Sequence, residues 1–221
     1  MRPAILALAL MAGSPGHAVE FIATSGRLTD TDFYRLVSCA AAPGQDCIER
    51  IVRWPDRTIG DLRVVLDPVH PDYPKGRAKE MLAALDMAIA ALNDSGAAIR
   101  LRRVPTGHAA PLRLYLTPAG DGGTIRGTGV DSVDGEVIGA GLTTVWWNDV
   151  YEITKALIVM ADDLPSREIY PVMLEELTQS MGLLTDIRNP LYDRDSVFSE
   201  DSNSVRQLGE QDIMALRRHY P

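Results

Sequence analysis

Oxygen-bearing side chains gather between residues 175 and 186, where their spacing could support ion binding or catalysis. Glu175 and Gln179 lie four residues apart, so on a helix they share one face, and Glu176 lies beside them. Asp186 follows a short distance further along the chain. Carboxylate and amide oxygens suit a hard ion such as Ca²⁺ or Mg²⁺. We therefore take Glu175, Gln179 and Asp186 as candidate metal ligands.

A second interpretation of the same stretch needs no ligand. On a helix that turns by about 100° per residue, its apolar residues fall on one side and Glu175 and Gln179 on the other. The apolar residues are Met173, Leu174, Leu177, Met181 and Leu184. This arrangement is typical of an amphipathic helix with a solvated polar face. Periodicity alone does not separate the two interpretations.

The stretch is also similar to the metzincin zinc-peptidase signature, His-Glu-x-x-His-x-x-Gly-x-x-His/Asp. The residues in register with it are Glu175, Glu176, Gln179, Gly182 and, at the third-ligand place, Thr185. The resemblance implies that Glu175 and Gln179 replace the two zinc-binding His residues, and that Glu176 keeps the place of the general base. It also implies a turn at Gly182, because glycine readily ends a helix and adopts positive φ.

Two downstream segments extend the resemblance. Ser196-Val197-Phe198 resembles the Ser-Ile-Met that opens the metzincin Met-turn, with Phe198 in place of Met. Residues 208–216, followed by Tyr220, resemble the last helix of the same peptidases. More closely, residues from about 50 to about 220 resemble a family of exported bacterial proteins known as domain of unknown function 2927. That likeness implies a zincin-like fold without an established activity.

The replaced ligands bear directly on activity. Zinc is normally held by thiolate, imidazole and carboxylate groups, and a neutral amide such as that of Gln179 is a poor substitute for imidazole. Without a metal, Glu176 has no bound water to deprotonate. A lone carboxylate also cannot supply the oxyanion stabilisation that peptide hydrolysis requires. We therefore predict no cofactor, with a divalent zinc or calcium ion as the alternative.

The rest of the chain predicts the scaffold that positions these residues. Apolar and β-branched runs indicate strands over residues 59–66, 99–104, 112–117, 142–147 and 153–160. A run rich in Ala, Leu and Met predicts a helix over residues 78–92. We expect an α/β (α+β) fold, with a zincin-like twisted mixed sheet of about four to five strands, two main helices and a small C-terminal helical subdomain. The Gly-rich residues 120–141 are interpreted as a loop or an edge-strand region.

Residues 1–18 have the pattern of a cleavable signal peptide. Arg2 precedes an apolar run over residues 4–12, and small residues end at Ala18. We predict cleavage after Ala18 and a periplasmic or secreted location, with an uncleaved N-terminal anchor as the alternative. No later stretch is long and apolar enough to span a bilayer, so no transmembrane segment is expected in the mature chain.

Export also bears on the two cysteines. Cys39 and Cys47 are the only cysteines in the chain, and an oxidising compartment favours a disulfide between them. Two buried free thiols are the alternative, because spacing alone does not show that the geometry permits a bridge. We place this pair in an N-terminal extension over residues 19–50, outside the main core, and the zincin-like domain over residues 51–221.

Charge and aromatic residues limit the partners. A formal net charge of -8 disfavours nucleic acid. Trp146 and Trp147 could line a cleft for peptide or carbohydrate, and we also place Thr185 there. Three hypotheses follow: an inactive zincin-like protein that binds a peptide or cell-envelope component, a metal-dependent hydrolase with Glu176 as base, and a structural envelope protein.

Overall fold

The computed structural model describes residues 19–221, so the predicted signal peptide lies outside the described residues. In this part of the chain, no helix combines the length and apolar character needed to cross a membrane. In chain order the elements are β1 (Phe21–Ala23), α1 (Asp30–Cys39), α2 (Asp56–Ile59), β2 (Leu62–Leu66), α3 (Lys75–Asp94), β3 (Leu101–Val104), β4 (Leu112–Leu116), β5 (Gly141–Trp147), β6 (Ile153–Met160), α4 (Ser166–Gln179), β7 (Asp186–Arg188) and α5 (Glu210–His219).

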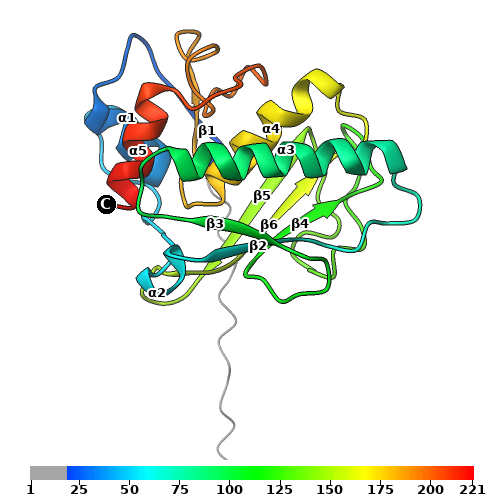
Figure 1. Ribbon diagram of the computed structural model, residues 1–221. Helices are drawn as coiled ribbons and strands as arrows, with labels where there is room; N and C mark the ends of the chain where they lie inside the picture. Colours follow the sequence, from blue (N-terminus) through cyan, green and yellow to red (C-terminus); the bar gives the residue numbers. More distant parts are fainter. Residues whose placement is uncertain (1–18) are drawn as a thin grey trace, which may run out of the picture.

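A mixed five-stranded sheet forms the centre of the molecule (Figure 1). Its strand order is β3-β2-β4-β6-β5, and all neighbours are parallel except β5, which runs antiparallel to β6. This confirms the predicted α/β class and the mixed sheet. The first central strand begins at Leu62 rather than at residue 59, because the preceding residues form the short helix α2.

Helices α3 and α4 pack against each other, and both contact the sheet. The predicted helix over residues 78–92 is confirmed and extends to twenty residues in α3. Its long Ala-, Leu- and Met-rich sequence places Met81, Leu85, Ala88 and Leu92 in the core, where burial of apolar surface stabilises the fold. The same core receives Met173 and Leu177 of α4 and so fixes which face of α4 turns toward the sheet edge.

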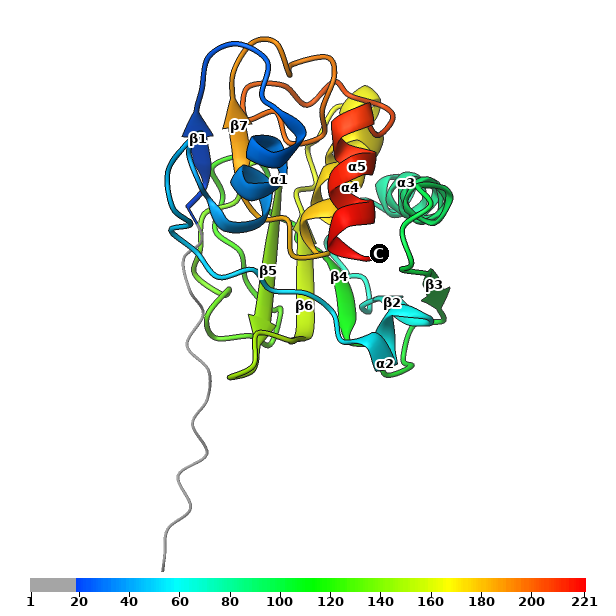
Figure 2. The same ribbon diagram turned by 90° about the vertical axis from the view of Figure 1, so that its left-hand side faces the viewer.

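The N-terminal segment and the end of the chain pack together beside the main sheet (Figure 2). Strand β1 pairs in parallel with β7, and α1 packs against α5. Phe33 of α1 is fully buried, with its ring 6.0 Å from that of Phe198. The expectation that residues 19–50 lie outside the main core is therefore wrong for α1, whose apolar face completes that core.

Cys39 and Cys47 form the predicted disulfide, with their Cα atoms 5.2 Å apart. Cys39 is the last residue of α1, so the bridge ties the end of this buried helix to the exposed loop that follows it. The described residues include no free cysteine.

Replacement of both cysteines by serine should lower the free energy of unfolding by about 2.5 kcal/mol, because the bridge restricts the unfolded chain through a short loop. Urea denaturation followed by circular dichroism measures this loss. Wild-type protein in reducing agent serves as the control and should match the double variant. An unchanged denaturation midpoint in both samples would contradict the stabilising role of the bridge.

Candidate functional site

A cleft of about 730 Å³ lies between the edge strand β5 and helix α4. We call it the acidic cleft, because six carboxylate residues line it: Glu20, Glu136, Glu175, Glu176, Asp186 and Glu200. Leu142, Val172, Leu184 and Trp147 add apolar surface. The cleft thus combines charge with apolar walls, as ligand sites commonly do.

Helix α4 presents Glu175, Glu176 and Gln179 to the cleft. It ends at Gln179, and the chain then turns through Gly182, which has a φ of 95°. This confirms the predicted turn at a glycine. The turn brings the chain back so that Asp186, at the start of β7, also lines the cleft.

Gln179 and Asp186 contact each other directly. The Gln179 Nε2 amide donates to Asp186 Oδ1 at 3.0 Å and to Oδ2 at 3.1 Å. Pairing of β1 with β7 fixes the backbone here, because the N–H of Asp186 donates to the carbonyl of Glu20 at 2.9 Å. The N-terminal segment therefore holds one wall of the cleft and contributes the Glu20 carboxylate to it.

The clustered carboxylates raise one another's pKa values. Burial raises the pKa of Glu175 well above its usual range, and the nearby charges of Asp186, Glu176 and Glu200 add to the effect. Burial likewise raises the pKa of Asp186, although the hydrogen bond from Gln179 opposes this shift. The pKa of Glu200 is raised by burial and by Glu20, while Arg188 opposes it from 2.9 Å.

Glu176 is the most enclosed carboxylate of the cleft, with 6% of its surface exposed. Burial raises its pKa to about 7, and the nearby Thr143 hydroxyl, which donates to the backbone carbonyl of Glu176 at 3.0 Å, partly opposes the shift. Its Oε2 atom has no hydrogen-bond partner among the described residues, and its Oε1 lies so close to Gly141 that a Cβ there would overlap it. A buried carboxylate in this state can exchange a proton near neutral pH.

The donor set does not fit zinc. No His lines the cleft, and within residues 19–221 no three His, Cys, Asp or Glu side chains are grouped so that they could hold a metal ion. The Gln179 amide nitrogen faces Asp186, so these two predicted ligands satisfy each other. A neutral amide paired in this way is a poor zinc ligand.

The structure brings together most of the residues selected from the sequence. Glu175, Glu176, Gln179, Asp186 and Trp147 line the acidic cleft. Trp146 and Thr185 do not line it. Trp146 lies under the Lys155 ammonium, 4.4 Å from its ring centroid, and Thr185 is buried with its N–H directed to the carbonyl of Val37.

Glu20 and Glu200 were not selected from the sequence as site residues. Glu20 reaches the cleft through the pairing of two three-residue strands, which carry no periodic signal. Glu200 follows the turn at Ser196-Val197-Phe198 and lines the cleft beside Asn203. The acidic character of residues 193–201 was the available signal for Glu200.

Asp212 fixes the position of that turn. Its carboxylate accepts hydrogen bonds from the Ser196 hydroxyl at 2.6 Å and from the backbone N–H of Val197 at 3.0 Å. It also accepts from the N–H of Gly209 at 2.8 Å, which caps α5. Burial raises the pKa of Asp212 to about 6. The turn and the last helix therefore form one hydrogen-bonded unit that supports the Glu200 side of the cleft.

Strand β5 offers an open edge to the cleft. The N–H of Ala161 donates to the carbonyl of Ala140 at 3.1 Å, and hydrogen-bonded pairs alternate along antiparallel strands. The alternation directs the backbone groups of Gly141, Thr143 and Val145 away from β6. Within residues 19–221, no other backbone segment pairs with this edge. An added strand could therefore bind there.

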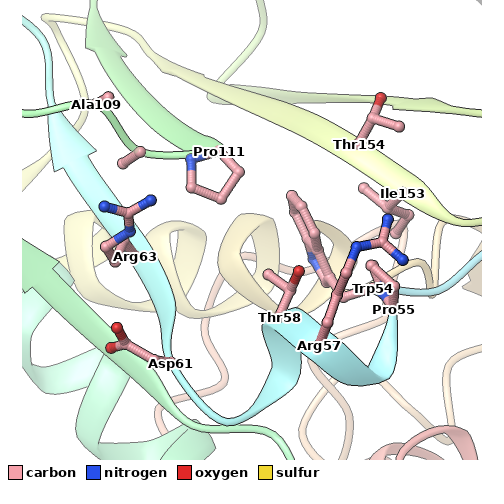
Figure 3. A pocket seen from close by; sticks show the side chains of 11 residues that line it. Trp54, Pro55, Arg57, Thr58, Asp61, Arg63, Ala109, Pro111, Ile153 and Thr154 are labelled. Carbon is pink, nitrogen blue, oxygen red and sulfur yellow. The ribbon is translucent and has the colours of Figure 1, made fainter.

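A second cavity of about 590 Å³ lies near α2 and the starts of β2 and β6 (Figure 3). In that view Arg57 and Arg63 lie on either side of the Trp54 indole. Arg57 pairs with Glu152 at 3.0 Å, and Asp61 pairs with Arg102 at 3.0 Å. These contacts balance much of the local charge, whereas none of the described residues that line the acidic cleft is a cation. The acidic cleft is therefore the stronger candidate site.

Fold and cleft define an α/β protein with an acidic site along the open edge of a mixed sheet. The chain belongs to the family described as "Protein of unknown function (DUF2927)", which matches residues 32–221. This confirms the family resemblance found in the sequence.

No curated protein matches the chain. Among solved structures, a chain described as "Structure of a chaperone-substrate complex" is similar, with a TM-score of 0.38 and 12% identity over 76% of this chain and 35% of that chain. This chain thus spans about a third of the length of that one.

Proposed function

We propose that this is an exported, zincin-like protein without a catalytic zinc site, and that it binds an extended peptide or peptide-containing envelope component in the acidic cleft. The observation that carries the proposal is the open edge of β5, which forms one wall of the cleft opposite α4. A strand added to an edge gains backbone hydrogen bonds, and the cleft walls select its side chains. The metzincin-like spacing of Glu175, Glu176 and Gly182 supports the zincin relationship.

Peptides with backbone N-methyl groups test this binding mode. Alternate amides of an added strand face β5 and the others face solvent. N-methylation of one alternate set in a binding peptide should abolish the signal in fluorescence polarisation, and N-methylation of the other set should leave it nearly unchanged. Equal sensitivity at all positions, or no binding by any peptide of an unbiased array, would contradict strand addition.

The protein side of the contact can be tested at Thr143. Thr143→Pro removes one outward N–H and should weaken peptide binding by about tenfold, a loss of about 1.4 kcal/mol. Thr143→Val keeps the N–H and removes only the hydroxyl, so it should weaken binding less. Proline is tolerated on an edge strand when its nitrogen faces solvent, and circular dichroism checks that the variant folds.

A metal-dependent hydrolase is the second candidate, because Glu176 has the burial and the pKa of about 7 that suit a general base. Elemental analysis of the purified mature protein, after dialysis against trace zinc, calcium and manganese, separates the candidates. Stoichiometric metal that disappears in Glu175→Ala would favour the hydrolase and overturn the proposal above. If the protein binds neither a peptide nor a metal ion, the remaining hypothesis is a structural envelope protein.

A further inference from the structure

The acidic cleft holds six carboxyl groups and, among the described residues that line it, no cationic side chain. Arg188, which pairs with Glu200 at 2.9 Å, is a neighbouring cation, but within residues 19–221 no Lys, Arg or His lines the cleft. Glu175, Glu176 and Asp186 lie deeper and influence one another electrostatically. Like charges gathered in one place favour a cationic ligand, because its charge would offset their repulsion.

An unsatisfied side-chain atom in the same cleft independently points to a missing partner. Oε2 of Glu176 has no hydrogen-bond donor among the described residues, although the residue is only 6% exposed. Buried polar atoms in folded proteins are normally paired, so an orphaned carboxylate oxygen on a residue that lines the cleft indicates a missing donor. In the described part of the chain, the Asp186 carboxylate receives a hydrogen bond only from Gln179, so it has lone pairs left to accept further donors.

The arrangement favours an organic cation over a metal ion. The carboxylates are spread along the cleft, and in residues 19–221 none of them belongs to a group of three that could hold a metal ion. Trp147, Leu142 and Val172 line the same cleft and supply the apolar surface that an aliphatic stem would cover. An indole can also attract a cation directly.

We propose that the acidic cleft selects a Lys or Arg side chain of an extended peptide bound along β5, with Glu175, Glu176 and Asp186 as its charge partners. The inference rests on the proposed peptide-binding function and adds its ligand class. A peptide places the backbone on the edge strand while one long side chain reaches toward α4. A Lys ammonium or an Arg guanidinium carries several N–H donors. It can therefore bind several carboxylates that are not arranged around one point, as a metal ion would require.

Proton release should accompany this binding. The carboxylates that face the ligand are Glu175 and Glu176 on α4, Asp186 on β7, Glu200 after the turn, Glu20 before β1 and Glu136 from the loop, with Arg188 as the neighbouring cation. A bound cation favours their ionised forms, while burial raises the pKa of Glu176 to about 7. Affinity for a basic peptide should therefore rise with pH through neutrality.

The test uses blocked heptapeptides of alanine and serine that differ only at the central residue, which is Arg, Lys, Gln or Glu. Isothermal titration calorimetry at about pH 8 should show the Arg and Lys peptides binding about tenfold more tightly than the Gln peptide. The preference should shrink at about pH 5.5 and in high salt. The combined Glu175→Gln and Asp186→Asn variant should bring the ratio of Arg to Gln affinity close to one.

Asp149→Asn is the matched control, because Asp149 is exposed and does not line the cleft. It should keep the wild-type ratio. Equal affinity of wild-type protein for the Arg and Gln peptides, or a preference for Glu, would overturn the inference and leave the peptide-binding function standing. No binding by any of these peptides, nor by the unbiased array, would overturn both. Since the pH and salt series needs only wild-type protein, a variant that fails to fold does not prevent a decision.

Discussion

Gly182→Ala should destabilise the protein by about 3 kcal/mol or more, a large effect for the addition of one methyl group. Gly182 has a φ of 95°, a conformation that L side chains rarely adopt. A Cβ at this position would also overlap the carbonyl oxygen of Val52 and approach the ring of His219. Strain and steric overlap act together, since Val52 is buried and its carbonyl is also hydrogen-bonded to His219 Nε2 at 3.0 Å.

The control for this variant is Gly26→Ala. Gly26 also has positive φ, at 70°, but a Cβ there would have nothing within 4 Å. Gly26→Ala should therefore lower the free energy of unfolding only through backbone strain, by about 1 to 2 kcal/mol. Urea denaturation gives both free energies. Similar losses in the two variants would contradict the steric contribution and leave conformational strain as the whole cause.

Destabilisation at Gly182 should also affect the site. The residue lies between Gln179 and Asp186, so a shifted turn would separate the amide from the carboxylate that it contacts. The spacing of these residues in the sequence already indicated a returning chain, because a glycine at the end of a helix permits this change of direction. Here the resemblance to the metzincin signature located the turn, and the conformational freedom of glycine supplied its physical reason.

Long-range pairing was harder to predict. The central strands carry alternating or continuous apolar patterns, and all five were located from them. Strands β1 and β7 have three residues each and pair across 165 positions, from Phe21 to Asp186. Strands this short have no measurable period, so the placement of Glu20 in the cleft could not be inferred. The packing of α1 into the core was missed for the same reason, since its partners lie at the end of the chain.

The polar face of α4 shows a second limit. A helical wheel places Glu175 and Gln179 away from the core, which is equally compatible with solvent and with a covered cleft. Strand β5 covers part of this surface: Glu175 and Gln179 are half-buried, and the neighbouring Glu176, which the wheel argument did not assign to the polar face, is nearly fully buried. The raised pKa of Glu176 depends on its burial beneath β5. No pattern in the sequence indicates directly that a strand packs over this face of the helix.

Glu176→Gln should remove a pH-dependent loss of stability. Burial raises the pKa of Glu176 from 4.5 in an unfolded chain to about 7 in the folded protein. Between these values the folded protein holds a proton that the unfolded chain has released, so stability is fully present below the lower pKa and falls as pH rises through the higher one. From about pH 5.5 to about pH 8.5 this group alone costs about 2 kcal/mol.

Other buried groups contribute to the same dependence of stability on pH. Burial raises the pKa values of Glu175 and Asp186 in the same direction, so the variant retains part of the decline. Burial lowers the pKa of His219 from 6.5 to about 4, which makes stability rise with pH below about 6.5. The contribution of His219 is common to both proteins and cancels in the difference. The charge of Glu176 adds to the pKa shifts of Glu175 and Asp186, so the difference between wild type and variant reports Glu176 together with this coupling.

Urea denaturation at several pH values measures the effect. The wild-type protein should lose about 2 kcal/mol more than Glu176→Gln between about pH 5.5 and about pH 8.5. Glu136→Gln is the control, because Glu136 lines the same cleft but is exposed, and it should follow the wild-type curve. Parallel curves for wild type and Glu176→Gln would show that Glu176 titrates as an ordinary surface carboxylate. That outcome would also remove the argument for Glu176 as a general base, since a base at neutral pH requires the same raised pKa.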